Sequence, residues 1–144
     1  MKTENLKLSY TILCDDVRIE MGNKLSLMGV FQNILVEKVP VSLIKFAVVQ
    51  HWSGIGTYLT EVRILSPDKL QVLVSSQPTQ IVLTTGGFAD NISFFVNAVF
   101  SAAGTYWVQT LVDANLFDEF ALNVSEVNLN RNQGEDESFP EILS

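Results

Sequence analysis

Apolar and polar residues alternate in short runs along nearly the whole chain, and clusters of turn-forming residues separate these runs. Such alternation is typical of β-strands, in which successive side chains point to opposite faces of a sheet. Breaks fall roughly every 8–12 residues, as in antiparallel sandwiches and barrels. The pattern therefore predicts an all-β fold, an antiparallel β-sandwich of about seven to nine strands. The predicted strands cover residues 6–19, 25–36, 43–52, 57–65, 70–75, 79–84, 92–100, 104–113 and 119–130.

Turn residues set several of these boundaries. Gly22 and Asn23 form a pair suited to positive φ, which predicts a hairpin between the first two strands. The segments SGIG (53–56) and TTGG (84–87) are predicted to interrupt the chain between strands. Tyr106 follows a glycine at the start of a later strand, so we expect its ring to be buried and its hydroxyl to bond nearby backbone.

The strand predicted at 104–113 has too many apolar residues for a sheet with one face in water. Trp107 and Leu111 fall on the side opposite its core-facing residues. The same doubled pattern recurs at 92–100 and 43–52, whereas an antiparallel sheet with one solvated face alternates cleanly. We therefore expect a second apolar face. The residues predicted to bind a partner there are Trp107, Leu111, Phe95 and Trp52.

Three different binding partners could bury such an apolar face. A second copy of the chain would produce a homo-oligomer, which is the favoured interpretation. The C-terminal tail or a long loop would cover it within one molecule. A different protein or an apolar ligand is the third alternative, since tryptophan and tyrosine are common anchors at interfaces.

Composition supports a sparsely charged domain. The chain has 144 residues, of which 47% are hydrophobic and 17% charged, below the usual charged share of about 25%. We expect one domain over residues 1–131. The net charge of −7 and the nine basic residues against sixteen acidic ones argue against nucleic acid and anionic membranes as partners. The single cysteine, the lack of a signal-peptide pattern and the lack of a long apolar run predict a soluble cytoplasmic protein.

Residues 132–144 differ in character from the rest. The segment GEDES (134–138) is polar and acidic, so a flexible C-terminal tail is predicted. The following segment, FPEIL (139–143), is apolar again. It is either a free end or a peptide that docks on its own domain or on a neighbour.

The sequence offers little catalytic chemistry. His51 is the only histidine, and we interpret it as a surface residue rather than a general base. Asp15 and Asp16 adjoin Cys14, where their charge raises the thiol pKa and favours a buried structural role. A zinc site is excluded, no phosphate-binding loop is complete, and no catalytic residue, metal or cofactor is predicted. An acidic cluster assembled from several loops leaves calcium as a minor alternative.

We therefore predict a non-enzymatic protein-interaction or assembly module that self-associates through an apolar sheet face. The alternative is a ligand-binding β-sandwich that takes a small molecule, a glycan or loop-bound calcium. A pocket lined by Trp52 and Trp107 would favour this alternative, whereas a broad apolar surface would favour the first function.

Two stretches, CDDVRIEMGNKLSLMGVFQNI (14–34) and AAGTYWVQTLVD (102–113), resemble a family of small bacterial β-sandwich proteins of unknown function. The resemblance implies an immunoglobulin-like sandwich and supplies no activity. The segment before the tyrosine departs from the pattern because it lacks the expected proline. The matching positions are Asp15, Gly22, Lys24, Leu25, Ser26, Leu27, Gly29, Val30, Phe31, Gly104, Tyr106 and Asp113.

Overall fold

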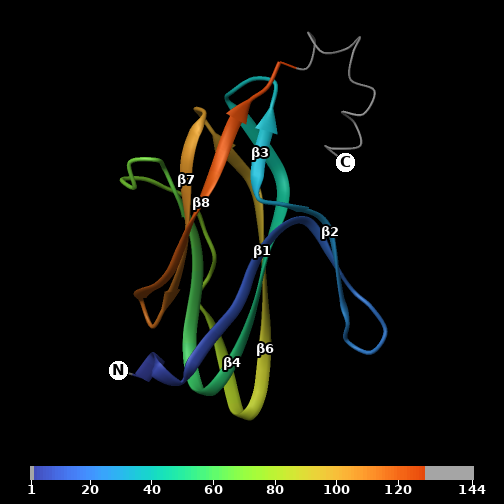
Figure 1. The fold of residues 1–144 in the computed structure, drawn as a ribbon, viewed down its shortest axis with the longest axis vertical. Helices are drawn as coiled ribbons and strands as arrows, with labels where there is room; N and C mark the ends of the chain where they lie inside the picture. The colour runs from blue at the N-terminus through green and yellow to red at the C-terminus, as the bar shows by residue number, and fades with distance from the viewer. Residues whose placement is uncertain (1, 129–144) are drawn as a thin grey trace.

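The structure is a computed structural model that describes residues 2–128. The predicted tail at 132–144 and the end of the predicted last strand lie outside the described residues. A single 3-10 turn, η1 (Lys2–Asn5), precedes eight strands (Figure 1). The strands are β1 (Leu6–Ile19), β2 (Leu25–Phe31), β3 (Asn33–Val36), β4 (Val41–Leu65), β5 (Val72–Ser75), β6 (Thr79–Phe100), β7 (Gly104–Val112) and β8 (Asn115–Glu126).

The strands confirm the predicted all-β class. Every pair is antiparallel except β3 and β8, which run parallel. Two layers result. The first layer contains β2, β1, the beginning of β4 and the end of β6; the second contains β3, β8, β7, the end of β4 and β5. The beginning of β6 extends the second layer.

Strand β4 belongs to both layers because it bends at Gly54 and Gly56, whose φ angles are +130° and +124°. Its pairing with β6 shifts register at this bend, and both strands turn at the same end of the molecule (Figure 1). The prediction of two separate strands around SGIG is therefore wrong, since backbone pairing continues through the bend. Strand β6 likewise continues through the predicted TTGG break, where Gly86 has a φ of +75°.

Two other local predictions have different outcomes. Gly22 and Asn23 both have positive φ, at 81° and 61°, and join β1 to β2 as predicted. The predicted strand at 25–36 is divided into β2 and β3 at Gln32, so that β3 can leave β1 and pair with β8 in the other layer.

The core lies between the layers and is built mainly from aromatic and branched side chains. Tyr106 is 2% exposed, and its hydroxyl donates a hydrogen bond of 2.7 Å to the Ala102 carbonyl. Its ring meets Phe100 edge to face at 5.0 Å. The predicted structural role of Tyr106 is confirmed, and this tyrosine corner is a feature of immunoglobulin-like sandwiches.

The bend in β4 gives a direct test of the fold. A Cβ added at Gly54 would overlap the backbone carbonyl of Asn5, whereas one added at Gly22 meets no atom within 4 Å. We expect Gly54→Ala to lower the free energy of unfolding by roughly 2–4 kcal/mol, from backbone strain and steric overlap together. Gly22→Ala serves as the control and should cost about 1 kcal/mol, from φ alone. Urea unfolding followed by circular dichroism measures both, and equal losses would contradict the role of the bend.

Candidate functional site

Three of the four predicted partner-binding residues lie inside the domain. Trp52 is 0% exposed, Phe95 5% and Leu111 7%. The expectation that they stand on an exposed face is therefore wrong. The alternation in β6 is interrupted at Asn97, whose φ is +53°, so that Phe95, Ala98 and Phe100 are all buried. Trp52 packs beside the bend, with its ring centroid 5.6 Å from that of Phe117.

Trp107 is half-buried on the outer side of the second layer and is covered by polar side chains. The Lys69 ammonium lies 4.4 Å from the centre of the Trp107 ring. The same ammonium forms an ion pair of 3.0 Å with Glu119. Gln109 then donates a 2.7 Å bond to Glu119 and accepts a 2.9 Å bond from Arg63. This polar network makes the surroundings of Trp107 a poor apolar surface.

The exposed apolar surface lies instead on the outer side of the first layer. Cross-strand partners in an antiparallel sheet share a face, and the register places Val96 beside Lys45, and Phe94 beside Ala47. We call this surface the outer apolar face. Its members are between 38% and 66% exposed. They are Tyr10, Phe88, Phe94, Val96 and Val99.

Small buried residues form the floor of the outer apolar face. Cys14, Ala47 and Val49 are each 0% exposed. Side chains of the β1–β2 hairpin and Ile92 pack against them and are themselves partly buried. Burial, with a smaller contribution from the charge of Asp15, raises the pKa of the Cys14 thiol. The predicted structural character of Cys14 agrees with this environment.

The polar side chains described on the outer apolar face have partners within the chain. His51 lies between the rings of Tyr10 and Phe88, at centroid distances of 5.4 and 5.1 Å. Its Nδ1 is 2.6 Å from a carboxylate oxygen of Asp90. Farther along, Lys45 lies 5.3 Å from the Phe94 ring centre and 3.1 Å from Asp16. The sequence pointed to His51 as a surface residue, but gave no sign of this aromatic stack.

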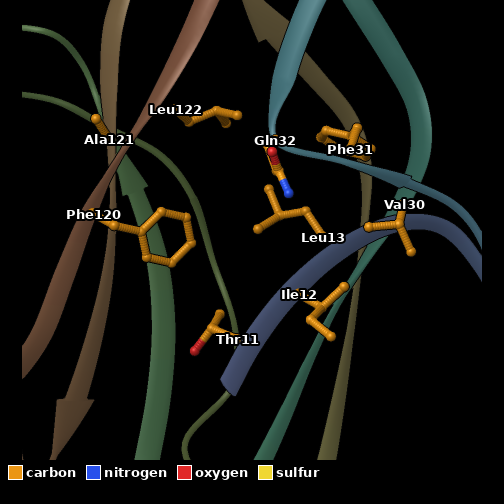
Figure 2. Close-up of a pocket in the computed structure, with 9 residues that line it drawn as sticks. All are labelled: Thr11, Ile12, Leu13, Val30, Phe31, Gln32, Phe120, Ala121 and Leu122. Carbon is orange, nitrogen blue, oxygen red and sulfur yellow. The ribbon is translucent and has the colours of Figure 1, made fainter. Parts of the chain in front are cut away.

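A second feature is a groove at the open seam between the layers. Strands β1 and β8 rise in the same direction and are not paired with each other (Figure 1). Between them lies a cavity of about 250 Å³ without a charged residue in its wall. Figure 2 shows its lining side chains, which are Thr11, Ile12, Leu13, Val30, Phe31, Gln32, Phe120, Ala121 and Leu122.

The cavity continues into a more open hollow along the same two strands, lined by residues 6–11 of β1 and by Phe117, Asp118 and Phe120 of β8. We call the cavity and this hollow together the seam groove. Neither Trp52 nor Trp107 lines it.

A buried polar layer lies under the seam groove. Gln50 is 1% exposed, and its Nε2 donates hydrogen bonds to Thr11 at 3.1 Å and to Thr110 at 2.8 Å. Within residues 2–128, the Gln50 Oε1 and the indole Nε1 of Trp52 are the buried side-chain polar atoms without a partner. Unmatched polar atoms at such depth are uncommon in folded proteins.

The acidic residues do not gather into a metal site in the part of the chain that the structure describes, where no group of three or more histidine, cysteine or acidic residues could hold an ion. Several accept hydrogen bonds within the chain: Asp68 accepts bonds from Ser66 and the Leu70 amide, and Asp113 accepts one from the Leu59 amide. For the same residues, no helix is long and apolar enough to cross a bilayer.

The layers, the tyrosine corner and the exposed sheet face define a small β-sandwich domain. The chain belongs to a family of unknown function (DUF6941), whose sequence model matches residues 9–125. This confirms the coarser expectation of a small β-domain of unknown function, and leaves the hairpin and Gly-x-Tyr patterns untested as family signatures. No curated protein matches the chain.

Three solved structures illustrate the similarities in shape. The Pseudomonas fluorescens alkylpurine DNA glycosylase AlkC bound to DNA has 6% identity and a TM-score of 0.49, over 83% of this chain and 30% of the glycosylase. A β-glucosidase from Listeria innocua with glucose has 10% identity and a TM-score of 0.47, over 85% and 16%. An immunoglobulin-like protein from Pseudomonas aeruginosa has 13% identity and a TM-score of 0.43, over 87% and 100%.

The polar network around Trp107 gives a prediction about pH. The hydrogen bond from Gln109, followed by the bond from Lys69, lowers the pKa of the Glu119 carboxyl. Because this pKa is lower in the folded chain, the stabilisation is present above the unfolded value and is lost as pH falls through the folded one. We expect Gln109→Ala to raise the Glu119 pKa, as measured by NMR of the carboxyl carbon. An unchanged pKa, with Lys69→Met raising it instead, would contradict the dominance of Gln109.

Proposed function

We propose that this protein is a non-enzymatic interaction module that self-associates by bringing together the outer apolar faces of two copies. The observation that carries the proposal is the exposure of five large apolar residues on one side of the first layer. Soluble monomers rarely leave a contiguous apolar patch of more than a few hundred Å² uncovered, and larger patches mark binding surfaces. Association would remove this surface from water.

A second copy suits this face because of its charges. The chain carries a net charge of −7, so contacts through the general surface of two copies are repulsive. On the outer apolar face, however, Asp16 pairs with Lys45 and Asp90 pairs with His51. Two such faces can therefore meet with the charge of Asp16 neutralised by Lys45 and with the Asp90 carboxylate in contact with the His51 ring.

The border of the face also suits a symmetric contact. Within the described residues β6 pairs only with β4, so its other edge carries unpaired backbone groups. A two-fold axis through the face would place the β6 strands of the two copies opposite each other, so that the same residues lie on both sides of the face-to-face contact. Four of the five residues of the face, from Phe88 to Val99, belong to this strand.

The scarcity of catalytic groups supports a non-enzymatic role. The chain has one histidine and one cysteine. The contact between His51 and Asp90 resembles that of an acid–base dyad, which would need a nucleophile beside it. The single cysteine, Cys14, is buried and has a raised pKa, so it is not an activated nucleophile. The face is therefore better suited to contact than to chemistry.

Sedimentation equilibrium tests the self-association. We expect wild-type protein to have a mass above the 16.0 kDa of one chain, and Val96→Glu to weaken association by at least about tenfold, because it adds repulsive charges to an apolar contact. Val82→Glu is the matched control, since Val82 is 62% exposed against 61% for Val96, and lies on the same strand beyond the Gly86 bend. A wild-type mass of 16.0 kDa at every concentration, or equal effects of both substitutions, would overturn the proposal.

A further inference from the structure

We propose that the seam groove is the docking site of the chain's own segment 139–143, FPEIL, which enters as an extended strand between β1 and β8. The groove opens at the seam between the layers, whereas the outer apolar face covers the outside of the first layer, and Tyr10 is the one residue that they share. The two proposals can therefore fail independently.

The backbone on both sides of the groove lacks pairing partners. Strand β1 pairs with β2 only from Leu13 onward, so one edge of residues 6–12 is open among the described residues. Strand β8 pairs with β3 only from Asn123 onward, so one edge of residues 115–122 is open as well. An extended peptide is the ligand that satisfies rows of N–H and C=O groups on both sides.

The position of the tail sets the direction of the added strand. The first half of β1, which lines the groove, and β8 both rise toward the end of the molecule at which β8 ends (Figure 1). A segment that returns from Asn128 into the groove would run against both neighbours. It would then form antiparallel pairs on each side, which is the more stable arrangement per residue.

The length of the chain beyond Asn128 is sufficient for this return. From Asn128 back to Leu122, at the upper end of the cavity, the strand covers roughly 20 Å, at about 3.3 Å per residue. The ten residues 129–138 can span up to roughly 33 Å. Phe139 therefore reaches the cavity with slack, and the acidic segment GEDES serves as the connection and stays in solvent.

The chemistry of FPEIL matches the groove better than that of any other part of the tail. The wall of the cavity is uncharged and mostly apolar. In an extended strand Phe139 and Leu143 share one face and offer apolar side chains to it at the two ends of the segment, with Glu141 between them, whereas residues 134–138 include three acids. Pro140 lacks an N–H and donates no hydrogen bond to either neighbouring strand, so the donors of the docked segment begin at Glu141.

Amide hydrogen exchange of the full chain tests this proposal. In wild type, we expect the groove-facing amides of residues 6–12 and 115–122 to be protected by the docked strand. In the double variant Phe139→Asp with Leu143→Asp, those amides should exchange at least about tenfold faster, because local opening controls exchange. The control, Asn132→Asp with Gln133→Asp, adds the same charge upstream of FPEIL and should leave exchange at the wild-type rate.

The outcomes separate the possible occupants. Unchanged exchange of residues 62–65 in the core shows that both variants remain folded. Equal exchange of the groove amides in wild type and in the double variant would overturn the proposal and leave the groove to a partner's peptide or a small apolar ligand. Protection that disappears on dilution to monomeric protein would overturn the intramolecular form, because the strand would then come from a second copy. Protection that persists at that dilution and is lost only in the double variant supports the proposal.

Discussion

The whole architecture depends on the bend of β4 at Gly54 and Gly56. This strand is central in both layers: β1 and β6 flank its beginning, and β7 with β5 and β6 flank its end. The bend is possible because glycine tolerates a φ near +130° and because the absence of a side chain lets the Asn5 backbone approach. If β4 ended at Gly54 instead of bending there, no continuous strand of the β4 type would join the two layers.

The two surfaces described above present different chemistry. The outer apolar face presents side chains, whose burial is favourable whatever the direction of the chain that covers them. The seam groove presents unpaired backbone groups beside a cavity with an uncharged wall, which suits an extended partner in register. Around Trp107, the outside of the second layer is covered by Lys69, Glu119 and Gln109 in a hydrogen-bonded network.

Strand content, the Gly22-Asn23 hairpin and the role of Tyr106 could be predicted, because each depends on local alternation or on one residue's conformational preference. The side of each strand that faces the core could not, because apolar residues occupy both sides. For this reason Trp52 and Phe95 were assigned to the wrong face. Ala47 and Val49 lie on the opposite side of β4 from Trp52 and are buried as well, because the β1–β2 hairpin covers them. The αL conformation of Asn97, which shifts the alternation in β6, is a weak signal in sequence, since asparagine also occurs in ordinary strands.

The parallel pair of β3 and β8 sets a limit on when the domain can form. Ile34 lies opposite Val124, and the Val39 amide donates a bond of 2.9 Å to the Glu126 carboxylate. These partners come from opposite ends of the described chain, and such non-local contacts slow folding. Because a protein is synthesised from its N-terminus, β3 cannot pair with β8 until translation has passed Glu126. The parallel pair is therefore a late step in the formation of the domain.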